Sequence, residues 1–241
     1  MNTPKQVFHS LWEEKLAGGG CELYVIGKNA RVDAAALALK PGGRLLDVGC
    51  GTGLLSLAAH SKFDEVHGVD LAEEAVAVAS TNGMIAHRLD LNVESLPYPA
   101  SFFDAITVLA VLPYVYDPKH VLSECCRVLR PSGQLLVAAA NMRTIAKMFR
   151  LCFLGRFPST SKGARAGYDG GAMHYFCSRD LSILLSDAGF HLVRATGLYY
   201  RPKIFGGNLS QLPMLRDTLR EFLAGEVLLE AERGYNEEAL S

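Results

Sequence analysis

Three glycines at alternating positions follow an aspartate in the segment LLDVGCGTG, which spans residues 45–53. Because glycine has no Cβ, such a backbone can turn sharply and let a ligand lie directly against it. Free N–H groups at the start of a following helix favour an anionic or strongly accepting group. The carboxylate of Asp47 favours an ammonium group, through Coulomb attraction in a partly dry cleft. The alternation of Gly49, Gly51 and Gly53 therefore predicts a small-ligand site on this turn.

The turn must be positioned by a strand before it and a helix after it. A continuous apolar run predicts a buried strand over 44–48, and the apolar residues that follow predict a helix over 54–59. The same alternation continues, with strands expected over 66–70, 84–90, 103–112, 134–140 and 190–200, and helices over 72–80, 117–129, 180–189 and 212–224. In this reading Pro131 and Gly133 end the helix over 117–129, and residues 225–233 form either a last strand or a helix. Alternating strands and helices predict right-handed βαβ units, hence an α/β protein with a mostly parallel, doubly wound sheet.

Two further segments flank or interrupt this pattern. Residues 1–40 predict an N-terminal helical cap with a hinge at the three glycines 18–20, and residues 141–175 form an insertion after the fifth strand. We expect one domain over residues 1–241, because α/β domains often reach this length.

Composition excludes several classes of protein. The hydrophobic fraction of 49% and the formal net charge of −1 are typical of a soluble globular protein and give no drive towards nucleic acid. No apolar run approaches the length of a membrane span, so we expect a cytoplasmic location. The six cysteines contain no C-x-x-C pair and several lie in apolar runs. They predict buried reduced thiols, with neither disulfides nor a metal site.

The glycine spacing distinguishes between two classes of cofactor. A dinucleotide site wants G-x-G-x-x-G, in which the third glycine allows close helix packing beside the pyrophosphate. Here Leu54 stands at that third position and the extra glycine is Gly53, so the spacing is G-x-G-x-G. Asp47 would also lie badly beside a pyrophosphate, which favours a ligand that carries an ammonium group.

With these residues in view, the chain resembles the class I S-adenosylmethionine-dependent methyltransferases. LLDVGCGTG matches the first motif of that family at every position, and further matching pieces follow in the same order: GVD at 68–70, LDLNVESLPYP at 89–99, SFFDAITVLAVLPYV at 101–115 and RVLRPSGQLLV at 127–137. The segment from His174 to Phe190 is similar to the late helix of the small-molecule members. The resemblance covers about residues 40–200 and implies a Rossmann-like, seven-stranded fold with S-adenosyl-L-methionine as cofactor.

The resemblance also implies roles for individual residues. Asp47 would hold the ammonium group of the cofactor, Asp70 both ribose hydroxyls and Asp90 the adenine amino group. The remaining cofactor residues would contribute backbone contacts to the methionine end and ribose (Gly49, Cys50, Gly51, Gly53), apolar walls for the adenine (Leu71, Leu91) or the surroundings of the methyl group (Leu109, Ala110).

Each of these positions also has a structural interpretation. Asp70 could cap the helix that follows it, and Cys50 reads as a small filler more than as a nucleophile. Asp104 lies at the start of its strand, away from the ligand edge, and Asp117 reads as a helix N-cap. We therefore assign Asp104 and Asp117 structural roles.

The acceptor side of the site offers two candidates for a side-chain base. Many relatives have a histidine after the fourth strand, whereas Pro113 and Tyr114 occupy that region here. We expect His174 to be the first candidate base, because imidazole accepts a proton near neutrality, and Tyr114 the second. The alternative is that His174 only ties the insertion to the sheet through hydrogen bonds.

The insertion carries the strongest charge anomaly of the chain. No acidic residue occurs from Cys125 to Tyr168, where there are eight basic ones. Helical spacing places Arg143, Lys147 and Arg150 on one face of a basic amphipathic helix. The helix either packs on the sheet edge with a solvated basic face, or belongs to a mobile lid that recognises an acidic or lipid-like acceptor, with residues 142–157 at a membrane surface.

The leading functional prediction is methyl transfer to an oxygen, nitrogen or carbon of a small acceptor, of anionic or lipid-like character. A nicotinamide-dependent oxidoreductase is the alternative enzyme, disfavoured by the glycine spacing and the lack of a Y-x-x-x-K pair. A catalytically silent S-adenosylmethionine-binding module is the non-enzymatic alternative. Nucleic-acid methylation is disfavoured, because no N-P-P-Y-type motif that would hold a flipped base follows the fourth strand.

Overall fold

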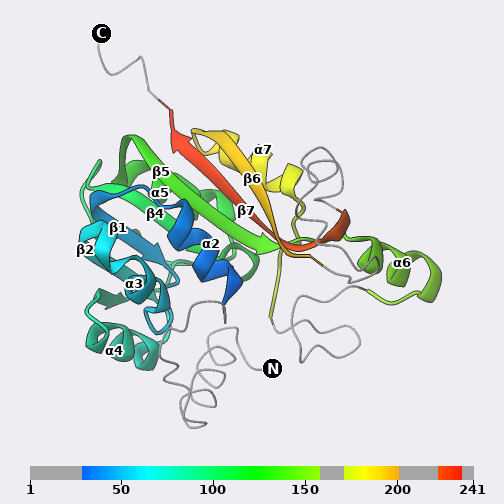
Figure 1. Ribbon diagram of the computed structural model, residues 1–241, viewed down its shortest axis with the longest axis horizontal. Coiled ribbons are helices and arrows are strands. Elements are labelled where there is room, and N and C mark those ends of the chain that lie inside the picture. Colours follow the sequence, from blue (N-terminus) through cyan, green and yellow to red (C-terminus); the bar gives the residue numbers. More distant parts are fainter. Residues whose placement is uncertain (1–28, 158–170, 201–221, 235–241) are drawn as a thin grey trace.

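The computed structural model describes residues 29–157, 171–200 and 222–234, which contain a single seven-stranded sheet (Figure 1). Its strands are β1 (Gly42–Val48), β2 (Phe63–Asp70), β3 (Ile85–Arg88), β4 (Phe103–Leu109), β5 (Leu129–Ala140), β6 (Phe190–Tyr200) and β7 (Ala224–Arg233). They lie side by side in the order β3-β2-β1-β4-β5-β7-β6. The five strands β3, β2, β1, β4 and β5 are parallel to one another, whereas β7 is antiparallel to both of its neighbours, β5 and β6.

Helices cover both faces of the sheet (Figure 1). They are α2 (Ala30–Ala38), α3 (Leu54–Ala59), α4 (Glu73–Thr81), α5 (Pro118–Val128), α6 (Ile145–Leu154) and α7 (Ser178–Asp187), with short 3-10 helices η1 (His60–Lys62) and η2 (Leu112–Tyr114). The predicted α/β, Rossmann-like class with seven strands is confirmed. The strand over 225–233, left open against a helix, is β7.

The central strands are apolar on both faces because a helix layer lies against each of them. In β1, Leu46 and Val48 belong to the apolar cluster beneath α5 and α7, whereas Leu45 belongs to the cluster beneath α2 and α3. All three side chains are fully buried. This two-sided burial is why the strand reads as a continuous apolar run.

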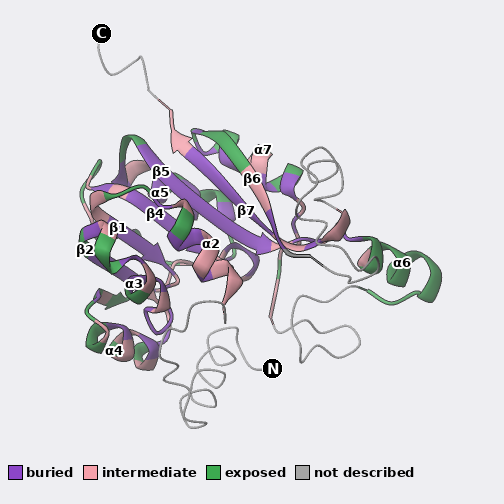
Figure 2. Ribbon diagram, in the orientation of Figure 1, coloured by how far each residue is buried: buried purple, intermediate pink, exposed green. Residues whose placement is uncertain are grey.

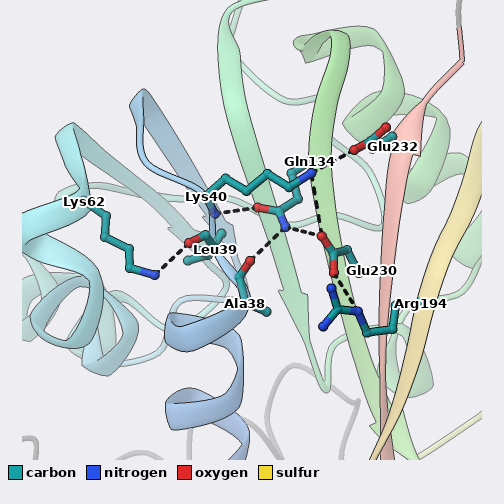
Figure 3. Close-up of polar contacts among 8 residues, drawn as sticks. All are labelled: Ala38, Leu39, Lys40, Lys62, Gln134, Arg194, Glu230 and Glu232. Carbon is teal, nitrogen blue, oxygen red and sulfur yellow. Dashed lines mark hydrogen bonds and ion pairs between the residues drawn. The ribbon is translucent and has the colours of Figure 1, made fainter.

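Helix α2 is fixed at its C-terminal end by a cation and an amide (Figure 3). The Lys62 ammonium donates to the carbonyl oxygens of Ala36 and Leu39, each at 2.7 Å, where the helix dipole favours a positive charge. The amide nitrogen of Gln134 in β5 donates to the Ala38 carbonyl at 3.0 Å. The end of α2 is therefore attached to the middle of the sheet.

Gln134 extends this attachment to β7 (Figure 3). Its amide nitrogen also donates to the buried carboxylate of Glu230 at 2.7 Å, and its amide oxygen accepts from the Lys40 backbone N–H at 2.9 Å. Lys40 and Arg194 form ion pairs with the β7 carboxylates of Glu232 (2.9 Å) and Glu230 (3.6 Å). Charged partners thus satisfy a carboxylate that would otherwise be costly to bury.

Helix α6 projects from the side of the molecule, and Figure 2 shows it as exposed. None of its residues is buried. The expectation that this helix packs on the sheet edge is therefore wrong, because amphipathic spacing does not by itself supply a surface that covers the apolar side. The expectation of buried thiols is wrong for Cys152, which is exposed on α6, whereas Cys50 and Cys125 are buried. The five cysteines of the described residues are all free thiols.

Several predicted boundaries shift in the structure. Helix α5 ends at Val128, and β5 begins at once, so Pro131 and Gly133 lie inside a strand and do not precede it. A register shift between Phe103 and Ala105 on the partner β4 accommodates this irregular start. The third strand is shorter than predicted, and the fourth ends at Leu109.

Parts of other predicted segments lie outside the described residues: 1–28 of the N-terminal cap, 158–170 of the insertion and 212–221 of the last predicted helix. Ala224, the predicted end of that helix, belongs to β7. Among the described helices, none has the length and apolar character needed to cross a membrane.

Candidate functional site

A cavity of about 440 Å³ opens at the carboxyl ends of the parallel strands. This is the edge at which open α/β sheets bind ligands, and the volume is ordinary for a small-molecule site. Among its lining residues are eleven that the sequence predicted: Asp47, Gly49, Cys50, Gly51, Asp70, Leu71, Asp90, Leu91, Leu109, Ala110 and Tyr114. The structure brings them together from the ends of β1, β2 and β4, the segment after β3, and η2.

The glycine turn lies between β1 and α3 and is held against β2. The backbone N–H groups of Gly49 and Cys50 both donate to the Val69 carbonyl, at 2.7 and 3.1 Å. Gly49 has a φ of +75°, and a Cβ there would lie 2.1 Å from Cγ2 of Val111. Both its backbone conformation and its surroundings therefore require glycine.

Gly53 has a different role from the other two glycines of the turn. It is the N-cap of α3, with a φ of +77°, and it is not among the described residues that line the cavity. A Cβ at this position would lie 3.2 Å from both Cα and Cβ of Ala79 in α4. In this structure Gly53 therefore allows the turn to pack closely against α4, and its predicted cofactor contact stays a prediction.

Asp47 is a buried carboxylate at the end of β1, only 3% exposed. The hydroxyl of Thr107 in β4 donates to its Oδ1 at 2.7 Å. Burial, with a smaller contribution from the charge of Asp70, raises the pKa of Asp47 to about 7, while the hydrogen bond from Thr107 opposes the rise. A positively charged ligand group beside Asp47 would restore its ionised form.

Asp70 ends β2 and joins the glycine turn to the next helix. Its carboxylate accepts from the backbone N–H of Gly51 at 2.8 Å and from that of Ala72 at 3.0 Å. Ala72 is the N-cap of α4. Asp70 therefore lines the cavity and holds the chain just before α4, but it is not the helix cap of the structural interpretation, because no side chain caps α4.

Asp90 follows β3 and shapes a tight turn. Its carboxylate accepts from the Asn92 N–H at 3.1 Å, and its carbonyl accepts from the N–H of Glu94 at 2.9 Å. The side-chain oxygen of Asn92 in turn accepts from the Tyr116 N–H at 2.7 Å. These bonds connect the segment after β3 to the loop after β4, so two walls of the cavity hold each other.

The end of β4 forms the wall at which the methyl group is expected. Ala110 has a φ of +63°, a conformation that is uncommon for any residue except glycine. Its N–H donates to the Ala138 carbonyl at 2.8 Å, which holds it in this conformation. The chain then turns into η2, where Tyr114 lines the cavity beside Val111 and Val115.

Cys50 behaves as a small apolar filler. Burial raises the pKa of its thiol far above the ordinary value, so the thiolate nucleophile is suppressed. A Cβ on Gly68 of β2 would lie 2.8 Å from the Cys50 sulfur and 2.2 Å from that of Met84. The glycine in the GVD motif therefore makes room for this side chain.

The sequence did not reveal the contribution of α2 to the cavity, through Asn29, Arg31 and Val32. Arg31 is the cavity's one cationic side chain among the described residues. Its guanidinium donates to both carboxylate oxygens of Glu226 in β7, at 2.8 and 2.5 Å. An ion pair between residues so far apart in the chain leaves no local pattern that could have identified it.

His174 does not line the cavity in the part of the chain that the structure describes. Its ring Nε2 lies 3.3 Å from the carbonyl oxygen of Tyr116, and its backbone N–H donates to the Pro113 carbonyl at 3.2 Å. Met173 N–H donates to the same carbonyl at 2.7 Å. These bonds tie the end of the insertion to the loop that carries Tyr114.

Asp104 and Asp117 are structural as expected, since Asp104 accepts from Arg44 N–H and Asp117 caps α5.

Comparison with known proteins agrees with this geometry. A family profile described as a methyltransferase domain matches residues 46–137. The ubiquinone biosynthesis O-methyltransferase of Xylella fastidiosa (strain 9a5c) is 33% identical over 169 residues, which are 67% of this chain and 66% of that protein. The chain thus spans just under two thirds of that relative. The protein of the same name from Xanthomonas oryzae pv. oryzae (strain PXO99A) is 32% identical over 182 residues, 72% of this chain and 71% of that protein.

Solved structures share the fold at lower identity. The structure of an S-adenosylmethionine-dependent methyltransferase from Thermotoga maritima has a TM-score of 0.65 and 18% identity, covering 94% of this chain and 98% of that one. That of the cyclase SpnF has a TM-score of 0.65 and 21% identity, covering 98% of both chains. Together with the matched profile and the curated relatives, the glycine turn and the three carboxylates on successive strand ends lead to one conclusion: the chain belongs to the class I S-adenosylmethionine-dependent methyltransferase family.

Proposed function

We propose that the protein transfers a methyl group from S-adenosylmethionine to an oxygen of a small amphiphilic acceptor. One observation carries the proposal. A single cavity joins a buried carboxylate with a raised pKa, a turn in which Gly49 has no room for a side chain, and carboxylates at the next two strand ends. Nucleophilic, metal-dependent or hydride chemistry does not require that combination, whereas a ligand that carries both an ammonium group and a ribose does.

The charges of the cavity fit the methionine end of this cofactor. Asp47 pairs with the ammonium group, which compensates the cost of burying the carboxylate. Arg31 reaches the carboxylate of the same moiety, with Glu226 holding the guanidinium in place. Gly49 and Gly51 let the backbone approach the ligand.

The other end of the cavity fits the nucleoside. Asp70 accepts from the ribose hydroxyls while it keeps the turn and α4 in register. Asp90 accepts from the adenine amino group, and Leu71 and Leu91 provide apolar walls for the ring. These assignments follow the order of the strands, from β1 to β3.

Bound S-adenosylmethionine supplies an electrophilic methyl group whose sulfonium leaving group departs as a neutral thioether. The protein then has to align the acceptor and exclude water, and alignment alone can lower such a barrier substantially. Leu109 and Ala110 lie at the methyl position, and the strained backbone of Ala110 fixes this wall. Tyr114 is the side chain that we propose to hydrogen-bond the acceptor oxygen, whose proton is lost to solvent as the acceptor binds.

His174 fits a positioning role better than that of a base. Its bonds to Pro113 and Tyr116 bracket Tyr114, so it holds the loop that contacts the acceptor. A base would need to reach the acceptor proton directly or through one water.

Two observations favour an amphiphilic acceptor with a hydroxyl group. Val111 and Val115 make the acceptor end of the cavity apolar, next to the single phenol of Tyr114. The curated relatives above are O-methyltransferases of ubiquinone biosynthesis, by name. We also propose a cytoplasmic location, since the free thiols of the described cysteines are typical of a reducing compartment.

The test combines binding with turnover. Calorimetry should show binding of S-adenosylmethionine and S-adenosylhomocysteine but not of reduced nicotinamide dinucleotide. Labelled cofactor should then transfer its methyl group to phenols with an alkyl tail in preference to amines with the same tail. Binding without transfer to any member of a broad acceptor panel would indicate a silent binding module, and nicotinamide binding alone would indicate an oxidoreductase.

A further inference from the structure

The segment 142–157, here called the α6 arm, contributes none of the described residues that line the cavity. It leaves the sheet after β5, which is parallel to β4, so the arm begins at the same edge as the end of β4 at Leu109. Its base is firmly built: the side-chain amide of Asn141 donates to the Ala224 carbonyl at 3.0 Å, and Met142 N–H donates to the Phe176 carbonyl at 2.9 Å. The Lys147 ammonium donates to the Asn141 carbonyl at 2.7 Å.

Beyond this base the arm is exposed, as the colouring of α6 in Figure 2 shows, and many of its side chains are large and apolar. The exposed fraction is 52% for Phe149, 74% for Phe153 and 62% for Phe157. Four further apolar residues of α6 are exposed: Ile145, Met148, Leu151 and Leu154. The rings of Phe149 and Phe153 stack on one another at 4.9 Å, so they form one continuous apolar surface. Exposed apolar side chains gathered in this way mark an interaction site.

The charge of the arm identifies what this surface meets. The arm has four basic residues, Arg143, Lys147, Arg150 and Arg156, and no acidic one. Arg143 lies over the ring of Phe222 and Lys147 binds the base, whereas Arg150 and Arg156 are exposed further out. Helical spacing puts Arg150 at the edge of the face that carries Phe149 and Phe153, and Lys147 on the opposite side.

We propose that the α6 arm docks on the surface of an anionic lipid bilayer. Phe149 and Phe153 enter the boundary between headgroups and acyl chains, and Arg150 and Arg156 lie against lipid phosphates. A folded protein partner would need a matching apolar groove, whereas a bilayer accepts any exposed aromatic helix with cationic flanks. Docking would place the cavity edge of the sheet near the membrane surface, where amphiphilic acceptors concentrate.

The experiment uses the full chain and sedimentation with vesicles of phosphatidylcholine, with or without about one third phosphatidylglycerol. We expect binding to the anionic vesicles, little binding to the neutral ones, and release by high salt, because screening weakens surface electrostatics. Arg150→Gln with Arg156→Gln should weaken binding on the order of 25-fold, roughly fivefold for each charge near the surface. Phe149→Ser with Phe153→Ser should weaken it at least as much.

A matched control removes equally exposed apolar residues elsewhere. Leu37→Ser with Val93→Ser, at positions that are 83% and 79% exposed, should leave vesicle binding unchanged. All variants should keep the circular dichroism spectrum and the cofactor affinity of the parent. A parent protein that failed to bind the cofactor would contradict the proposed function, and not the docking of the α6 arm. Equal binding to neutral and anionic vesicles, or equal losses in the control, would overturn the proposal. The proposal would also be overturned if the phenylalanine variant changed the oligomeric mass measured by light scattering but not the binding to vesicles. A second copy of the chain would then cover this face.

Discussion

Replacing Asp47 with asparagine should make the empty protein more stable at pH 8 while it weakens cofactor binding. The folded-state pKa of Asp47 is about 7, against an ordinary value of 3.8 for an exposed aspartate. The folded protein therefore holds a proton that the unfolded chain has lost between about pH 4 and pH 7. Stability falls as the pH rises through this window and levels off above it.

The magnitude follows from the shift of about three pKa units. At about 1.4 kcal/mol for each unit, the ionised carboxylate lowers the free energy of unfolding by ~4 kcal/mol at pH 8. Asparagine keeps the acceptor for the Thr107 hydroxyl, but its buried amide nitrogen costs ~1–3 kcal/mol if it finds no partner. We expect Asp47→Asn to gain ~1–3 kcal/mol at pH 8 and to be no more stable than the parent at pH 5.

Urea unfolding followed by circular dichroism at pH 5, 6, 7 and 8 measures this crossover. Thr107→Val is the companion variant: it removes a donor that favours the ionised form, so the fall in stability should continue to a higher pH than in the parent. Calorimetry should show cofactor binding weakened about 10- to 150-fold in Asp47→Asn, the range for losing a charged hydrogen bond. Parallel stability curves for Asp47→Asn and the parent, with no crossover between pH 5 and pH 8, would refute the buried-charge argument.

Three further perturbations follow from the site. Asp70→Ala should weaken binding of S-adenosylmethionine by ~1–3 kcal/mol on calorimetry, because hydrogen bonds to a carboxylate are lost. Gly49→Ala should abolish that binding, since its Cβ would lie 2.1 Å from Cγ2 of Val111. Gly83 has a similarly positive φ, but a Cβ there would have nothing within 4 Å. Gly83→Ala should therefore cost only backbone strain, ~1–2 kcal/mol in urea unfolding. His174→Gln should lower turnover by less than about tenfold with an unchanged pH profile, against the ~10²–10⁴-fold that a general base contributes.

Each of these predictions has a result that contradicts it. Unchanged affinity in Asp70→Ala would remove the ribose assignment. Equal effects of alanine at Gly49 and at Gly83, both on cofactor binding and on urea unfolding, would show that backbone strain, and not the contact with Val111, decides the first. A loss above a hundredfold in His174→Gln, with a shifted pH optimum, would restore His174 as the base.

The sequence predicted the sheet, and most of the residues that line the cavity at the strand ends, because their causes are local. A strand buried on both faces must be apolar throughout, as Leu45 and Leu46 show. Gly49 combines a positive φ with no space for a Cβ, so this position of the turn must be glycine. The carboxylates at strand ends follow from the strands that precede them. Fold class and the place of the cavity were therefore accessible from the sequence alone.

What was missed depends on residues distant in the chain. Arg31 meets Glu226 only after β7 has inserted beside β5, and neither residue stands in a recognisable motif. Gly53 belongs to the same glycine motif as Gly49, but the residue packed against it is Ala79 of α4, which the motif does not reveal. Amphipathic spacing in α6 indicates an apolar face, but whether that face is covered depends on elements that the helix itself does not encode.

The position of β7 also affects how the chain reaches its folded state during synthesis. β6 pairs only with β7 among the described strands, and β7 follows β6 in the sequence after roughly two dozen residues. At ~5–20 residues per second, a nascent chain spends on the order of seconds with β6 unpaired and the edge of β5 open. Any product that stops before Ala224 keeps both strand edges permanently, and such edges pair readily with other chains. The ribosome-bound chain, more than the finished protein, is therefore where we expect chaperones to be needed and where premature stop codons should produce aggregates.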